Sequence, residues 1–169
     1  MIRAGILGAT GYTGYELVRL LKNHPYVELT YLGSSSSAGR PYAEIYPQLA
    51  GDGDLMLGDE EVPDVDVLFC ALPHGLTAHR ASGWLERGIR VIDLGADFRI
   101  KDAGVYEQWY NLKHPAPQLL EQAVYGLPEI YREGLKGTAL VANPGCYPTA
   151  SILPLWPLLK EKLIKTQSI

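Results

Sequence analysis

Residues 143–149, Asn-Pro-Gly-Cys-Tyr-Pro-Thr, have the residue types and order that could do covalent chemistry. Cys146 follows a Pro-Gly turn, and the apolar pattern that comes next predicts a helix over residues 149–163. A helix N-terminus has unpaired N–H groups and a partial positive charge, which favour the reactive thiolate form of cysteine. The segment therefore indicates Cys146 as a nucleophile that could take up an acyl group. The alternative is a small buried side chain at a strand–helix corner.

Residues 8–14, Gly-Ala-Thr-Gly-Tyr-Thr-Gly, lie between an apolar strand and an amphipathic helix. This is the setting in which spaced glycines bind the pyrophosphate of a dinucleotide at a helix N-terminus. Gly8 would permit the tight turn, Gly11 would let the pyrophosphate approach, and Gly14 would let the helix pack closely. The candidate cofactor-binding residues here are Gly8, Thr10, Gly11, Tyr12, Thr13 and Gly14. The apolar face of the helix is expected to comprise Leu17, Val18, Leu20 and Leu21.

The end of the second predicted strand, residues 27–32, favours NADP over NAD. NAD-binding domains usually carry a carboxylate about 20 residues beyond the glycine turn. Residues 33–40 read Gly-Ser-Ser-Ser-Ser-Ala-Gly-Arg, and Glu28 stands at the wrong end of the strand. Ser34, Ser36 and Arg40 would suit a 2′-phosphate. A polar loop without a ligand is the alternative.

Apolar strand segments alternate with helical segments along the rest of the chain. The alternation predicts an α/β fold, a Rossmann-type doubly wound parallel sheet. In such sheets ligands bind beyond the carboxyl ends of the strands. We therefore expect one rim that brings the cysteine near the cofactor, lined by Gly8, Gly33, His74, Gly95 and Cys146.

Composition narrows the class of protein. The chain has 169 residues and a formal charge of −4, so no broad basic surface favours nucleic acid. Neither a transmembrane run nor a signal-peptide pattern is present, which indicates a cytoplasmic protein. Cys70 lies in an apolar run typical of a buried strand and is expected in the core. The two cysteines and the scattered histidines do not have metal-ligand spacing, so no metal is expected.

Several segments together resemble N-acetyl-γ-glutamyl-phosphate reductase over essentially the whole chain. They are Gly-Ala-Thr-Gly-Tyr-Thr-Gly at 8–14, Ala-Leu-Pro-His-Gly at 71–75, Asp-Leu-Gly-Ala-Asp-Phe-Arg at 93–99, Tyr-x-x-Trp-Tyr at 106–110, Val-Tyr-Gly-Leu-Pro-Glu at 124–129 and residues 143–149. The resemblance implies an enzyme of arginine biosynthesis that reduces N-acetylglutamyl phosphate to the semialdehyde with NADPH. This family is related to aspartate-semialdehyde dehydrogenase.

The resemblance also implies residue roles. Cys146 would attack the acyl phosphate, and the thioester so formed would be reduced with NADPH to the aldehyde. Pro73 and His74 would lie beside the cofactor, and Asn143 would help to hold the developing oxyanion. Arg99 would bind substrate, or else form a structural ion pair. Many relatives have an arginine within residues 34–37, where this chain has Ser35, so Arg40 would carry more of the phosphate binding.

Members of that family are about twice as long as this chain, with a substrate domain and a catalytic histidine beyond the cysteine. All histidines here precede Cys146. The resemblance therefore implies an NADP-binding domain at 1–146 and the start of a truncated catalytic domain at 147–169, with a strand beginning at Lys165. A homo-oligomer is expected at full length, with a small acyl phosphate as substrate.

Other classes of function remain as alternatives. Short-chain reductases and epimerases can share the Gly-Ala-Thr-Gly start but need Tyr-x-x-x-Lys, and no tyrosine here has a lysine four places on. A nucleotide-binding module without turnover is a second alternative. Within the enzyme class, aspartyl or aminoadipyl phosphate could replace the acetylglutamyl substrate.

Overall fold

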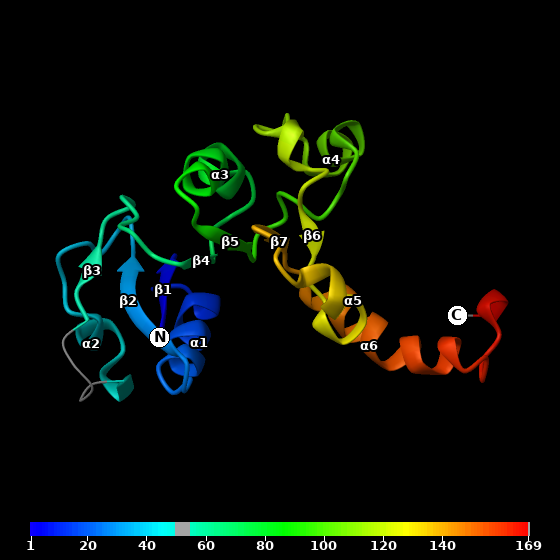
Figure 1. The fold of residues 1–169 in the computed structure, drawn as a ribbon, viewed down its shortest axis with the longest axis horizontal. Helices are drawn as coiled ribbons and strands as arrows, with labels where there is room; N and C mark the ends of the chain where they lie inside the picture. The colour runs from blue at the N-terminus through cyan, green and yellow to red at the C-terminus, as the bar shows by residue number, and fades with distance from the viewer. Residues whose placement is uncertain (50–54, 169) are drawn as a thin grey trace.

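The computed structural model describes residues 1–49 and 55–168, which form a parallel seven-stranded sheet (Figure 1). The order across the sheet is β3-β2-β1-β4-β5-β7-β6. The strands are β1 (Ile2–Leu7), β2 (Val27–Gly33), β3 (Leu57–Gly58), β4 (Val67–Cys70), β5 (Arg90–Asp93), β6 (Val124–Tyr125) and β7 (Leu140–Ala142). Every pairing between these strands is parallel, so their carboxyl ends meet at one edge.

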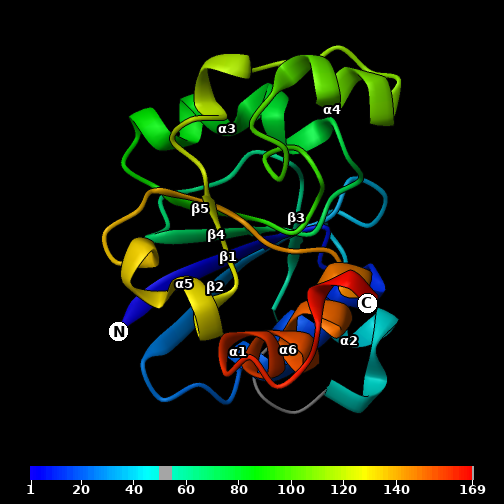
Figure 2. The ribbon, with the colours of Figure 1, turned by 90° about the vertical axis from the view of Figure 1, so that its right-hand side faces the viewer.

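Helices cover both faces of the sheet, as a parallel sheet requires. Figure 2 shows α3 (Leu76–Glu86) and α4 (Ala103–Tyr110) above the sheet and α1 (Tyr12–Leu21) below it. Each face has its own core. Alternating strand residues such as Leu7 and Leu68 pack with Trp84 of α3, whereas Ile6 packs with Val18 of α1.

Short helices and 3-10 turns lie between the main strands and helices, and one 3-10 turn follows the last helix. They are α2 (Tyr42–Ile45), α5 (Pro128–Leu135), and the 3-10 turns η1 (Pro47–Leu49), η2 (Pro117–Leu119) and η3 (Thr166–Ser168). The last long helix, α6 (Cys146–Lys160), leaves the sheet and runs away from it toward the C-terminus (Figure 1). None of its residues is buried, although it contains Trp156 and Leu158, which are 43% and 37% exposed.

The structure confirms the predicted Rossmann-type sheet and places Cys146 at a helix N-terminus, as expected, but the bounds of several elements differ from those predicted. The helix after the cysteine begins at Cys146 rather than at 149 and ends at Lys160. The strand expected from Lys165 is wrong, because Thr166–Ser168 form a 3-10 turn. Leu20 was expected on the apolar face of α1 but is 57% exposed, since α1 packs on the sheet through Val18.

Within residues 1–49 and 55–168, no helix is long and apolar enough to cross a membrane.

Candidate functional site

The glycine turn between β1 and α1 has a shape that its glycines make possible. Gly8 has φ +77, and a Cβ there would lie 2.3 Å from the Ala71 carbonyl oxygen. A Cβ on Gly14 would lie 2.2 Å from the Gly8 carbonyl oxygen, so α1 packs directly on the turn. Gly11 differs, because a Cβ there would make only an ordinary 3.5 Å contact. The close contacts explain Gly8 and Gly14, whereas the fold itself sets no steric requirement for glycine at position 11.

Hydrogen bonds fix the carbonyl side of this turn. The hydroxyls of Tyr42 and Tyr46 donate to the carbonyls of Ala9 and Thr10 at 3.0 and 2.7 Å. The N-cap of α1 is Gly11, which has no side chain to satisfy the first-turn N–H groups. Since these N–H groups also lack intrahelical partners, they are available to an anion.

A cavity of about 160 Å³ opens at this turn and is here named the glycine-turn cavity. Gly8, Thr10 and Gly11 line one side, and residues 34–36 at the end of β2 line another. Residues 71–73, which follow β4, form the remaining wall together with Glu60. The Thr10 and Ser34 hydroxyls are 3.1 Å apart and join the turn to the serine run.

Five of the eleven predicted cofactor residues lie outside the lining of the glycine-turn cavity: Tyr12, Thr13 and Gly14, which belong to α1, and the more distant Arg40 and His74. Arg40 is exposed, and its Nε donates to Glu44 at 3.1 Å. His74 is exposed, and its ring contacts Tyr110 with 5.5 Å between centroids. The charged group that does line the cavity is Glu60, whose carboxylate forms an ion pair with Arg80 of α3.

Cys146 is exposed at the first position of α6, directly after the N-cap residue Gly145. It lines a second cavity of about 640 Å³, here named the cysteine cavity. Thr13, from the first turn of α1, lines the same cavity. The segment at 8–14 therefore contributes to both cavities, whereas His74 and Gly95, which were expected on the same rim, line neither of them.

Arg99 and Asn143 also line the cysteine cavity, and both hold the cysteine loop in place. The Arg99 guanidinium donates from Nε to the Asn143 carbonyl at 2.8 Å and from Nη2 to the Leu94 carbonyl at 2.9 Å. Its Nη1 lies beside Gly145, where a Cβ would come within 3.1 Å of it. The Asn143 N–H donates to the Asp93 carbonyl at 2.8 Å, while its side-chain amide donates to the Pro144 carbonyl at 3.0 Å. The cysteine loop is thus attached to the end of β5.

Cys70 has the opposite environment. It is fully buried in β4, as expected, and burial raises the pKa of its thiol far above the ordinary value. Burial also raises the pKa of the neighbouring Asp93 carboxyl to about 6. A thiol kept protonated within a core is a poor nucleophile, so Cys146 is the cysteine suited to chemistry.

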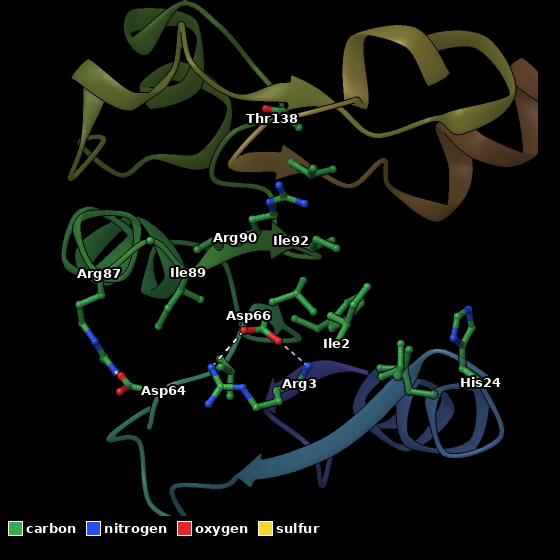
Figure 3. A pocket seen from close by; sticks show the side chains of 18 of the residues that line it. Ile2, Arg3, His24, Asp64, Asp66, Arg87, Ile89, Arg90, Ile92 and Thr138 are labelled. Atoms are coloured by element: carbon green, nitrogen blue, oxygen red, sulfur yellow. Dashed lines mark hydrogen bonds and ion pairs between the residues drawn. The ribbon is translucent and has the colours of Figure 1, made fainter.

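A larger cavity of about 850 Å³ lies at the amino edge of the strands, opposite the motif residues (Figure 3). Its acidic groups are already paired, Asp66 with Arg3 at 3.0 Å and Asp64 with Arg87 at 2.9 Å. No residue of the glycine turn or of the cysteine loop contributes to its lining.

The sequence reasoning missed some of the lining residues. Glu60 lines the glycine-turn cavity, and Thr149 lines the cysteine cavity, where its hydroxyl donates to the Gly145 carbonyl at 2.9 Å. Thr149 could have been found by its spacing within the motif at 143–149. Glu60 carries no local signal, because its place depends on how β3 pairs.

In residues 1–49 and 55–168, no group of three or more His, Cys, Asp or Glu could hold a metal ion.

A parallel sheet with a glycine turn at the start of its first helix defines a Rossmann-type dinucleotide-binding domain. The family model for "Semialdehyde dehydrogenase, NAD binding domain" matches residues 3–138. The chain belongs to this family of NAD-binding domains.

Curated relatives include N-acetyl-gamma-glutamyl-phosphate reductases from several bacteria. That of Desulforudis audaxviator is 56% identical over 97% of this chain and 49% of its own length. That of Halothermothrix orenii is 50% identical over 100% of this chain and 50% of its own length. The chain therefore spans about half the length of the curated relatives it matches.

Solved structures with the same fold include aspartate semialdehyde dehydrogenases. The Vibrio cholerae enzyme II matches 95% of this chain and 43% of its own with a TM-score of 0.71 and 22% identity. The Candida albicans enzyme, solved with NADP, matches 95% of this chain and 47% of its own with a TM-score of 0.63 and 20% identity. At these identities the likeness concerns the fold.

Proposed function

We propose that this chain is the cofactor-binding half of an NADPH-dependent N-acetyl-γ-glutamyl-phosphate reductase of arginine biosynthesis. The observation that carries the proposal is the shared border of the two cavities. Gly8, Thr10 and Gly11 line the glycine-turn cavity, and Thr13 lines the cysteine cavity with Cys146. One turn would therefore hold a dinucleotide within reach of an exposed thiol. Relatives of that name, 50–56% identical, support the choice of reaction.

In the proposed reaction Cys146 is the nucleophile. Its sulfur forms a bond to the acyl carbon, and the bond from that carbon to the phosphate oxygen breaks, so that inorganic phosphate leaves. When bound, NADPH supplies the hydride that reduces the resulting thioester. The thiohemiacetal anion then expels the Cys146 thiolate and becomes the aldehyde. This divides one difficult step into two easier ones.

The cysteine loop offers groups for the charges of these steps. The Asn143 side chain and the backbone N–H groups after Cys146 are the candidates for the developing oxyanion. Arg99 would act as the anion partner of the substrate. Its Nε and Nη2 are occupied by loop carbonyls, whereas Nη1 lies at Gly145 beside Cys146. The same side chain would thus hold the loop and bind an anion.

The glycine turn would hold the pyrophosphate through its backbone, and the proposed residues are Gly8, Thr10, Gly11, Tyr12, Thr13 and Gly14. Ser34 and Ser36 line the glycine-turn cavity and would bind the 2′-phosphate of NADPH, and Pro73, which lines the same cavity, would contact the cofactor. Arg40 would have to exchange Glu44 for that phosphate. Their pair is exposed, and exposed ion pairs are worth about 0.2–1 kcal/mol, so the exchange costs little. His74 would contact the cofactor from the turn that follows Pro73.

The further expectations follow the same proposal. Residues 1–146 would form the NADP-binding domain and 147–169 the start of the catalytic domain, because α6 leaves the sheet at Cys146 (Figure 1). A cytoplasmic location, a homo-oligomer at full length and the absence of a nucleic-acid partner are part of it. The formal charge of −4 supports the last point.

Fusion to the second half of a relative provides a direct test. We would join this chain to the remaining half of the Desulforudis audaxviator relative and assay NADPH oxidation with N-acetylglutamyl, aspartyl and aminoadipyl phosphates. The proposal predicts turnover with the acetylglutamyl substrate, and loss of turnover but not of NADPH binding in Cys146→Ser. Preference for another acyl phosphate would redirect the substrate assignment, and full activity of Cys146→Ser would refute the mechanism.

A further inference from the structure

Asp97, four residues after the end of β5, lies at the centre of a buried hydrogen-bond network. Its side chain is fully buried and accepts three hydrogen bonds. Oδ1 accepts from the Gly75 N–H at 2.5 Å and from the Tyr106 hydroxyl at 3.3 Å. Oδ2 accepts from the Ala78 N–H at 2.9 Å. Gly75 and Ala78 begin α3, so a carboxylate about 20 residues away in sequence caps that helix.

The main chain of Asp97 is held as firmly as its side chain. Its N–H donates to Asp93 at 3.2 Å, and its carbonyl accepts from His114 Nε2 at 2.7 Å. His114 Nδ1 accepts from the Ala116 N–H at 3.1 Å, which assigns the ring proton to Nε2. Asp97 therefore has one position relative to the end of β5.

The cap on α3 differs in kind from an ordinary helix cap. At α4 the cap is local, because Asp102 accepts from the Val105 N–H at 2.9 Å. At α3 the N-cap is Gly75, with φ +89 and no side chain, and residue 97 supplies the carboxylate instead. A local cap would stabilise α3 equally well. Only a distant one also fixes the start of α3 relative to β5.

The start of α3 matters because the residues before it form a cavity wall. Residues 71–73 line the glycine-turn cavity together with Gly8 and Gly11. The Ala71 carbonyl lies so close to Gly8 that a Cβ there would come within 2.3 Å of it. A shift of Gly75 therefore moves this wall against the glycine turn.

We propose that Asp97 is a positioning residue that, through its hydrogen bond to Gly75, holds residues 71–73 in place as one wall of the dinucleotide site. This rests on the proposed function, in which the glycine-turn cavity takes a dinucleotide. Asp97 itself lines neither cavity, so it acts through Gly75 and the residues before it. The wall is shared by NADPH and NADH, whereas Ser34 and Ser36 would distinguish them.

The test compares Asp97→Asn with Asp102→Asn in this chain. Asparagine keeps one carbonyl oxygen at 97 but turns an NH2 group toward an N–H or O–H donor. Asp102→Asn removes the same charge at an exposed cap where asparagine serves equally well. NADPH and NADH affinities are measured by fluorescence titration, and the exchange of the Gly75 and Ala78 amides is measured by NMR.

We expect Asp97→Asn to raise both dissociation constants together, by about tenfold, and to speed exchange of both amides. Asp102→Asn should do neither. Affinities within about twofold of the parent protein despite released amides would overturn the proposal. So would a changed NADPH-to-NADH preference, or unchanged amide exchange.

The test also covers a variant that does not fold and a parent chain that binds no dinucleotide. If Asp97→Asn does not fold, Tyr106→Phe removes one bond to the same carboxylate and keeps the ring, and it should weaken both cofactors in the same direction but less. Unchanged affinities in that variant would overturn the proposal. If the parent chain binds neither dinucleotide, the proposed function fails. Amide exchange at Gly75 and Ala78 then shows separately whether Asp97 holds the turn.

Discussion

Replacing Gly11 with alanine should separate cofactor binding from folding. Gly11 has φ −80 and ψ 167, a conformation that alanine adopts freely. Its added Cβ would meet only the Gly8 carbonyl oxygen, at 3.5 Å. Alanine is the poorer N-cap by a few tenths to about 1 kcal/mol, but it stabilises through the unfolded state by about 0.4–1 kcal/mol. These effects nearly cancel, so the free energy of unfolding should hardly change.

NADPH binding, unlike the free energy of unfolding, should be strongly affected by Gly11→Ala. A methyl group placed where a pyrophosphate approaches the backbone overpacks that contact, at a cost of about 1–3 kcal/mol. The dissociation constant for NADPH should therefore rise about 5- to 150-fold. The assays are urea unfolding and calorimetric titration with NADPH.

Gly83→Ala is the matched control, because Gly83 lies inside α3 with nothing within 4 Å of its added Cβ. It should stabilise the fold by about 0.5–1 kcal/mol without changing affinity. Gly14→Ala, which would place a Cβ 2.2 Å from the Gly8 carbonyl oxygen, should lose both stability and binding. If Gly11→Ala bound NADPH like the parent protein, the turn would not lie against a pyrophosphate and the reasoning would be refuted.

The remaining predictions concern specificity, pH and assembly. Arg40→Ala should weaken NADPH binding by about 1.5–3 kcal/mol and leave NADH unchanged in the same titration, and equal losses for both cofactors would contradict the 2′-phosphate assignment. The pKa of Asp93 is raised from 3.8 to about 6, chiefly by burial, so the folded state holds this proton more tightly than the unfolded state. The unfolding free energy should accordingly fall by about 2 kcal/mol as pH rises from about 4 to 6. In urea titrations Asp93→Asn should lose this dependence on pH, and the same dependence in both proteins would count against the assignment. The chain alone should give no reductase turnover in an activity assay, and it should self-associate through exposed apolar groups such as Trp156 and Leu163. Turnover by a protein that light scattering shows to be a monomer would contradict both expectations.

The parallel sheet and its rim followed from local patterns. Strands such as β1 and β4 are mainly apolar runs, with Gly8 directly after β1 and Pro73 shortly after β4, and such runs are buried between helices wherever the fold places them. The glycine turn and the helix start at Cys146 are likewise set by neighbouring residues. These features could be predicted because no distant contact decides them.

Other features depend on distant partners and could not be predicted. The strands β3 and β6 have two residues each and show no periodicity. The pair between Arg40 and Glu44 requires α2, a single helical turn without a sequence signal. Asp97 stands among apolar neighbours in the sequence, but its role at α3 emerges only when β5 and α3 are packed together. The segment at 93–99 carries part of the family resemblance, but nothing in its residues or spacing indicates a role for Asp97.

Acylation of Cys146 is the most direct test of the proposed chemistry. The folded chain would be incubated with N-acetylglutamyl phosphate, and its peptides would be analysed by mass spectrometry. We predict a hydroxylamine-sensitive acyl adduct on Cys146, none on buried Cys70, and none on Cys146→Ser. An unmodified Cys146, or an adduct on Cys70, would contradict the assignment of the nucleophile.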